Sequence, residues 1–296
     1  MDEKDLSAPV KPEKKKKRHF ILAVIVVALL LIIVGSIVGE KLMIPIRRGF
    51  PNMDDGIAFL LEYLLFIGID ILVLVYCALW EKDIFRSFLH PKQGGAAGNT
   101  GKDFALGLLI GFVMNGICIL IAWLHGDVHF YAGRFQLLYL LCAFVCVCVQ
   151  SGAEELVTRG YMMGALGKRY PVWVAIATNA LLFAALHLAN TGITVLSFLN
   201  IAAIGLALSL VIYYLDSLWM CVAIHTAWNF TQNFLFGLPN SGVVSKSSFL
   251  HLDAASDSLF YDVAFGVEGT LTAVVVIAAF AVGVVLFVKR KGLKAR

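Results

Sequence analysis

The sequence predicts an all-α, polytopic transmembrane helical bundle, and three observations indicate this fold class. The chain has 296 residues, of which 60% are hydrophobic, well above the roughly 45–50% that is usual in soluble domains. Long runs without charged residues recur along it, each close to the roughly 20 residues that one membrane crossing requires. Lysine and arginine gather in alternate loops between these runs, which is typical of membrane proteins with a defined orientation.

The apolar runs predict about eight membrane spans with both termini cytoplasmic. If all eight cross the membrane, 18 of the 24 lysines and arginines fall on one side and only 5 on the other. Because positive residues accumulate in cytoplasmic loops, the richer side is the cytoplasm. The net charge of +4 therefore reflects orientation, and no nucleic-acid partner is expected. The candidate spans are residues about 20–39, 57–80, 104–124, 136–165, 171–190, 194–215, 218–236 and 269–289.

The chain divides into five parts. Residues 1–18 form a basic cytoplasmic tail, and residues 19–103 hold the N-terminal transmembrane helices and a Gly-rich linker. Residues 104–236 form a core of spans that carries the unusual polar residues. Residues 237–268 form an acidic extracytoplasmic loop, and residues 269–296 form the last transmembrane helix and a second basic tail. The basic tails favour an integral, multi-pass protein of a bacterial plasma membrane, with a eukaryotic endomembrane as the alternative.

The fourth predicted span contains two adjacent carboxylates and a guanidinium, at Glu154, Glu155 and Arg159. Placing such groups in hydrocarbon costs several kcal/mol, so they indicate a functional site. Residues four apart share one face of a helix, which predicts that Glu155 and Arg159 form an ion pair. Glu154 points elsewhere and is free to face a cavity as a base.

Two later spans add polar side chains, His187 in one and the pair His225 and Asn229, four residues apart, in the other. Both members of this pair can donate hydrogen bonds, which suits an oxyanion formed during acyl transfer. With Glu154 as the general base, the set provides what amide hydrolysis needs. The same residue types also serve proton or ion relays in transporters and polar helix–helix contacts in non-catalytic proteins. A metal site is a further alternative, because Glu154, His187 and His225 are of the types that bind zinc.

Three short motifs run through these residues. E-E-x-x-x-R spans Glu154–Arg159, F-x-x-x-H spans Phe183–His187, and H-x-x-x-N spans His225–Asn229. In this order and in a helical membrane context, they resemble the CPBP family of intramembrane proteases. That family includes CAAX prenyl endopeptidases of the Rce1 type and bacterial Abi proteins linked to bacteriocin processing and immunity. The resemblance covers about residues 104–236.

The resemblance implies an intramembrane endopeptidase in which Glu154 and His187 activate the attacking water. It also implies that His225 and Asn229 stabilise the oxyanion, while the ion pair of the first motif has a supporting role. The family has been described both as metalloproteases and as glutamate-type proteases, so a divalent metal such as zinc stays open as a cofactor. The expected partners are membrane lipid and a peptide or lipidated-protein substrate, prenylated and CAAX-type or bacteriocin-like, which enters from the bilayer. The alternative is a non-catalytic immunity or scaffold protein of the same family.

Helix geometry conflicts with this assignment if the helices are straight and perpendicular to the membrane. With 1.5 Å of rise per residue, Glu154 lies roughly 25 Å from the outer end of its span, and His187 lies roughly 24 Å from the cytoplasmic end of the next. Tilted helices, or a fifth helix that starts below the cytoplasmic surface, are needed to bring the two side chains together. We expect the site to open toward the cytoplasmic half of the membrane.

Overall fold

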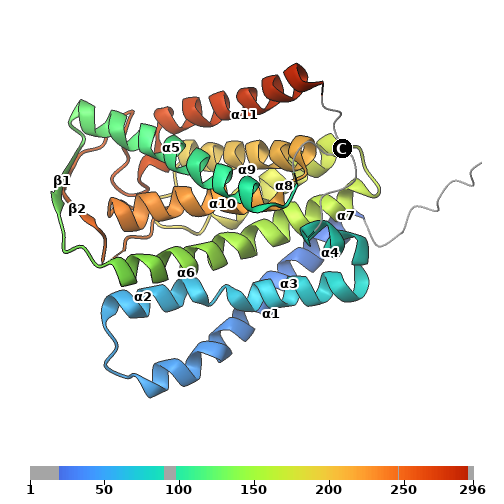
Figure 1. Ribbon diagram of the computed structural model, residues 1–296, viewed down its shortest axis with the longest axis horizontal. Helices are drawn as coiled ribbons and strands as arrows, with labels where there is room; N and C mark the ends of the chain where they lie inside the picture. The colour runs from blue at the N-terminus through green and yellow to red at the C-terminus, as the bar shows by residue number, and fades with distance from the viewer. Residues whose placement is uncertain (1–19, 90–97, 246, 293–296) are drawn as a thin grey trace, which may run out of the picture.

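The computed structural model describes residues 20–89, 98–245 and 247–292. The predicted basic tail at residues 1–18 and most of the Gly-rich linker lie outside the described residues. Helices make up 74% of the described part and strands very little of it, and this confirms the predicted all-α bundle. Figure 1 shows the long helices lying alongside one another, with β1 (Val128–Ala132) and β2 (Leu250–Ala255) at one end and α7 (Met163–Gly167) toward the other.

The remaining elements follow the predicted spans closely. Thr100, Thr194, Ser217 and Thr270 each cap a helix start by accepting a backbone N–H with the side chain. The helices are α1 (Ile21–Gly49), α2 (Asp55–Leu64), α3 (Ile67–Trp80), α4 (Lys82–Leu89), α5 (Gly101–His125), α6 (Leu137–Glu155), α8 (Val172–Leu186), α9 (Val195–Leu215), α10 (Leu218–Phe230) and α11 (Leu271–Lys291), with π-helical segments at Leu156–Met162 and Thr231–Leu235 and a 3₁₀ turn at Val267–Gly269.

Among the described residues, six helices are long and apolar enough to cross a membrane by length and composition. Two predicted spans fall outside this set. At 15 residues, α8 is about 22 Å long, which is short of a hydrocarbon core of about 30 Å. The predicted span 218–236 consists of α10 and the π-helical segment that follows it. The total of eight spans stays a prediction.

Glycines set the crossing of α1 with the α2–α3 pair. Gly35 and Gly39 lie four residues apart on α1, and Gly68 lies on α3. A Cβ at Gly35 would lie 2.6 Å from the Cα of Ile69, and one at Gly39 would overlap the Leu65 carbonyl oxygen. Small residues at this spacing let membrane helices approach closely. The contact falls where the predicted span 57–80 is interrupted, between α2 and α3.

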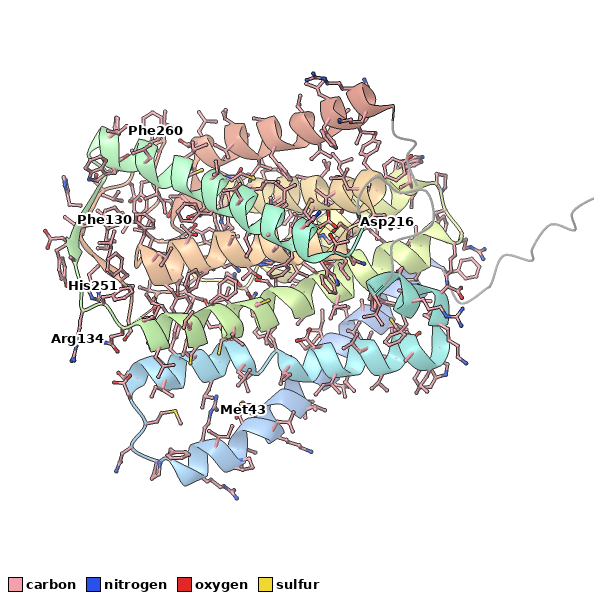
Figure 2. The ribbon with its side chains drawn as sticks, viewed as in Figure 1. Met43, Phe130, Arg134, Asp216, His251 and Phe260 are labelled. Carbon is pink, nitrogen blue, oxygen red and sulfur yellow. The ribbon has the colours of Figure 1, made fainter. Side chains whose placement is uncertain are left out.

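Two loops that were predicted to lie on the same side of the membrane form one small sheet. β1 comes from the connection after α5, and β2 comes from the long loop after α10; the two strands pair antiparallel, with a bulge between His129 and Phe130. Figure 2 shows His251 and Phe130 at this end of the molecule, whereas Asp216 of the α9–α10 connection lies toward the other end. The pairing agrees with the predicted placement of both loops on one side.

Helix α10 is the centre of the bundle. It packs against α5, α6 and α9, while α8 and α11 pack against α9. Helices α6, α8 and α10 carry the three motifs, so their packing brings together side chains that are more than 70 residues apart in the chain.

Candidate active site

The predicted ion pair between Glu155 and Arg159 is confirmed. Nη1 of Arg159 lies 3.0 Å from Oε1 of Glu155, and both side chains are fully buried. The same carboxylate oxygen lies 3.0 Å from Nδ1 of His225. Glu155 therefore joins the first motif to the third, and it holds the imidazole of His225 in one orientation.

A π-helical segment, Leu156–Met162, begins directly after Glu155. In its first turn the Thr158 hydroxyl donates a hydrogen bond to the backbone oxygen of Glu154 and accepts one, at 2.9 Å, from Nη1 of Arg159. Such wide turns within α-helices are rare and occur frequently at functional sites. The guanidinium of Arg159 is thereby held beside the carboxylate of Glu155.

Glu154 turns away from the ion pair, as the helical spacing predicted. Its Oε1 accepts a hydrogen bond from Nε2 of Gln150. Its Oε2 is buried and has no hydrogen-bond partner in the part of the chain that the structure describes, and it lies 3.7 Å from Nε2 of His225. A polar separation of this length leaves room for a water that contacts both atoms.

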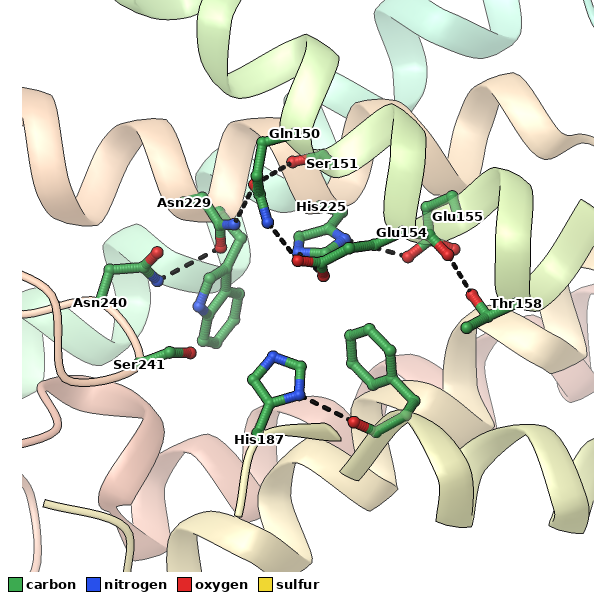
Figure 3. A network of polar contacts seen from close by, with 12 residues as sticks. Gln150, Ser151, Glu154, Glu155, Thr158, His187, His225, Asn229, Asn240 and Ser241 are labelled. Carbon is green, nitrogen blue, oxygen red and sulfur yellow. Dashed lines mark hydrogen bonds and ion pairs between the residues drawn. The ribbon is translucent and has the colours of Figure 1, made fainter. Parts of the chain in front are cut away.

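His187 follows α8 as its C-terminal cap and lies across the site from Glu154 (Figure 3). Its Nδ1 is 2.8 Å from the backbone oxygen of Phe183. A carbonyl oxygen only accepts, so Nδ1 carries the proton, and Nε2 of the neutral ring is an acceptor. Figure 3 shows Nε2 directed into the space between the helices.

Phe183, the first residue of the second motif, packs against Arg159 of the ion pair and against both histidines. The guanidinium carbon of Arg159 lies 4.3 Å from the centroid of the Phe183 ring. The same ring lies 4.9 Å from the imidazole of His187 and 6.0 Å from that of His225, centroid to centroid. The aromatic side chain therefore covers the buried cation and walls the site.

The predicted conflict in depth is resolved by where the helices turn. From Glu154 to the end of α7 at Gly167 the chain rises about 20 Å, and from the start of α8 to His187 it rises about 23 Å. The two side chains therefore reach nearly the same level. The fourth span was predicted to end at residue 165, whereas α7 continues to Gly167.

One cavity of about 500 Å³ is lined by all four predicted catalytic residues, Glu154, His187, His225 and Asn229. Much of its wall is apolar, with side chains from α1, α3, α9 and α11. The lining also includes residues of the long loop after α10, so the cavity reaches toward the end of the bundle that carries β1 and β2. The expected opening toward the cytoplasmic half stays a prediction. The apolar lining includes Ile32, Ile69, Ile204 and Ile277.

Among the polar residues that line the cavity, sequence reasoning missed Gln150, Asn240, Ser241 and Glu268. Gln150 interrupts an apolar run one turn before Glu154, and this was a signal that could have been used. The others lie on or next to the long loop and carry no motif. Oε1 of Glu268 accepts hydrogen bonds from Nε1 of Trp228 at 2.9 Å and from Nδ2 of Asn240 at 3.1 Å. Its Oε2 accepts from the backbone N–H and the hydroxyl of Ser241, both at 2.7 Å. Burial raises the pKa of Glu268, and the hydrogen bonds from Ser241 act in the opposite direction.

The candidate metal ligands do not gather into a metal centre. Among the described residues, no three His, Cys, Asp or Glu side chains are grouped so that they could hold a metal ion. Glu154 and His225 approach each other, but Nδ1 of His225 is bound to Glu155, and His187 lies on the facing wall. In this arrangement Glu154, His187 and His225 do not fit a metal site.

Comparison with known proteins gives one match. Residues 133–231 match the family model described as type II CAAX prenyl endopeptidase Rce1-like. A search of curated proteins and a search of solved structures each gave no match. The matched segment contains all three motifs. Together with the six apolar helices, the match makes the chain an integral, multi-pass membrane protein.

Proposed function

Because residues 133–231 match the Rce1-like family model, we propose that the chain is an intramembrane endopeptidase that hydrolyses a peptide bond of a membrane-associated substrate. One observation carries the proposal: Oε2 of Glu154 is buried, has no hydrogen-bond partner among the described residues, and lies on the wall of a cavity that His187 also lines. A buried acceptor without a partner is costly unless a water or a substrate group satisfies it. We place the attacking water beside this oxygen.

Glu154 is the general base of the proposed reaction, and His187 is its partner on the facing wall. Glu154 accepts a hydrogen bond from Gln150 on one oxygen and keeps the other for the water. Nε2 of the neutral His187 is an acceptor that is directed into the same space. A water between the two meets an acceptor on each side, and this arrangement orients its oxygen lone pairs toward the substrate carbonyl.

His225 and Asn229 are the proposed oxyanion donors. Since Nδ1 of His225 donates to Glu155, Nε2 can donate as well only when the ring is protonated. A protonated ring balances the charges of the cluster, because two carboxylates then face one guanidinium and one imidazolium. Buried charges are stable only when they are paired in this way. Asn229 has a second amide hydrogen besides the one that it donates to Gln150.

The cavity wall supports a substrate that is partly apolar. Isoleucine and phenylalanine side chains face the cavity from several helices, including Ile32 and Phe66 near α1 and α3. A peptide with a lipid chain or an apolar segment could bury that part here while its backbone reaches Glu154. We propose a peptide or lipidated-protein substrate, prenylated and CAAX-type or bacteriocin-like, and a bacterial plasma membrane as the location.

The proposal is tested by comparing newly formed peptide termini in membranes that contain the natural protein or its Glu154→Gln variant at matched amounts. Glu40→Gln is the control, because Glu40 is an exposed carboxylate that does not line the cavity. Termini that are present with the natural protein and the control, and absent with Glu154→Gln, are the expected result. If all three proteins fold and give identical termini, the non-catalytic immunity or scaffold role replaces the proposal.

A further inference from the structure

Three amide side chains link Glu154 to Glu268 along the cavity wall. Nε2 of Gln150 donates to Oε1 of Glu154, and Nδ2 of Asn229 donates to Oε1 of Gln150 at 3.2 Å. Nδ2 of Asn240 donates to Oδ1 of Asn229 at 3.2 Å and to Oε1 of Glu268 at 3.1 Å. All five side chains line the cavity, and Figure 3 shows the part of the chain from Asn240 to Glu154.

The two carboxylates fix the direction of this chain. An ionised carboxylate only accepts hydrogen bonds, so the amide nitrogen must face it at each end. Asn240 donates in both directions through its nitrogen. Asn229 and Gln150 each donate through nitrogen and accept through oxygen, so the orientation of one sets the orientation of the next. As a result, Gln150 presents an N–H to Glu154, and Asn229 turns its nitrogen away from the loop.

The loop end of the chain is a tight turn held by several contacts. Asn240 and Val243 exchange two backbone hydrogen bonds around Ser241, with φ of 48°, and Gly242, with φ of 83°. A non-glycine residue rarely adopts such a φ, and positions of this kind occur at functional sites where the surrounding structure enforces them. Here Glu268 accepts both the backbone N–H and the hydroxyl of Ser241.

We propose that Asn240 and Glu268 are positioning residues, which orient Asn229 and Glu154 for catalysis through this chain of amides. The catalytic unit then extends beyond the matched segment, residues 133–231, into the loop after α10. The inference rests on the proposed function for the roles of Glu154 and Asn229. The chain of hydrogen-bonded amides can itself be tested without a substrate.

The test is an isosteric substitution that reverses the direction of the hydrogen bonds along the chain of amides. Asn240→Asp replaces the donor to Asn229 by an acceptor and also removes the donor to Glu268. The loss at Glu268 is common to every Glu154 background, so it cancels when the backgrounds are compared. Asn229 must then rotate its nitrogen toward the loop, Gln150 must rotate in turn, and the oxygen of Gln150 comes to face Glu154. Glu154→Gln supplies a donor at that point and relieves the conflict, whereas Glu154→Met removes the charge and supplies no donor.

Thermal unfolding of the full chain in detergent gives the readout. We expect the loss of midpoint that Asn240→Asp causes to be about 2–4 °C smaller in the Glu154→Gln background, which corresponds to one hydrogen bond regained. In the Glu154→Met background, we expect Asn240→Asp to cause the same loss of midpoint as in the natural protein. If the loss of midpoint is reduced equally in the Glu154→Gln and Glu154→Met backgrounds, the effect is one of charge. If it is reduced in neither, the orientation of the amide at one end of the chain does not set the orientation at the other. Either result overturns the inference.

Asn233→Asp is the matched control. Nδ2 of Asn233 donates to the backbone oxygens of Leu238 and Val243, so it holds the same loop from outside the chain. The loss of unfolding midpoint that Asn233→Asp causes must be equal in the natural protein, in Glu154→Gln and in Glu154→Met.

Cleavage of a farnesylated CAAX-type peptide gives a second, independent readout. Asn240→Asp is expected to lower kcat by about 10²–10³, the usual loss for a misplaced oxyanion donor, whereas Asn233→Asp is expected to leave the kcat of the folded protein within about threefold. If the natural protein cleaves nothing, the proposed function fails, and the unfolding experiment still decides the chain. Equal kcat losses in the two variants would reduce Asn240 to a structural role.

Discussion

Arg159→Met is expected to destabilise the fold strongly, because it leaves the carboxylate of Glu155 buried without its cation. The two side chains are fully buried and 3.0 Å apart, and methionine keeps most of the volume that packs on Phe183. Removing one partner of a buried ion pair costs about 3–5 kcal/mol. Nδ1 of His225 still donates to the same oxygen, so we expect a loss near the lower end, about 3 kcal/mol.

Reversible unfolding by SDS titration in mixed micelles measures this loss. The companion variant combines Arg159→Met with Glu155→Gln, which removes the stranded charge and keeps an acceptor for His225. It is expected to recover most of the lost free energy of unfolding. A loss below about 1 kcal/mol, the value typical of exposed pairs, would refute the reasoning, as would a double variant no more stable than Arg159→Met alone.

Two further predictions concern packing and catalysis. Gly39→Ala should cost about 1–3 kcal/mol of unfolding free energy, because the new methyl group meets the Leu65 carbonyl. A Cβ added at Gly116, which is also helical, would meet nothing within 4 Å, so Gly116→Ala should raise the free energy of unfolding by up to about 1 kcal/mol. Equal effects of the two variants would contradict the close crossing of α1 with the α2–α3 pair. His187→Gln should lower kcat for a farnesylated peptide by about 10²–10⁴ with unchanged thermal stability, and full activity in this variant would remove His187 from the mechanism.

Hydropathy predicted where the helices lie because burial in lipid imposes one simple demand on every span. It did not predict where helices break or widen. The interruption between α2 and α3 depends on contacts with Gly35 and Gly39 of another helix. The π-helical segment after Glu155 depends on how Arg159 reaches its partners. Neither cause is visible in a local stretch of sequence.

Some residues of the candidate site could be predicted from the sequence, and others could not. Charged and polar residues in apolar runs identified Glu154, Glu155 and Arg159, because such residues are costly in a membrane. The roles assigned to Glu154, His187, His225 and Asn229 stay predictions that the structure makes geometrically compatible. Asn240 and Glu268 lie in a polar loop, where their residue types are common. Both line the cavity, where the turn at Ser241 lies beside Glu268.

The measurement that tests the central claim most directly is the rate at which the purified full chain, reconstituted in lipid, cleaves a farnesylated CAAX-type peptide. If Glu154 activates the attacking water, Glu154→Gln lowers kcat by about 10²–10⁴ and changes KM little. Glu40→Gln then cleaves at the natural rate. Cleavage by Glu154→Gln at the natural rate, at one and the same peptide bond, would contradict the claim that this carboxylate is the base.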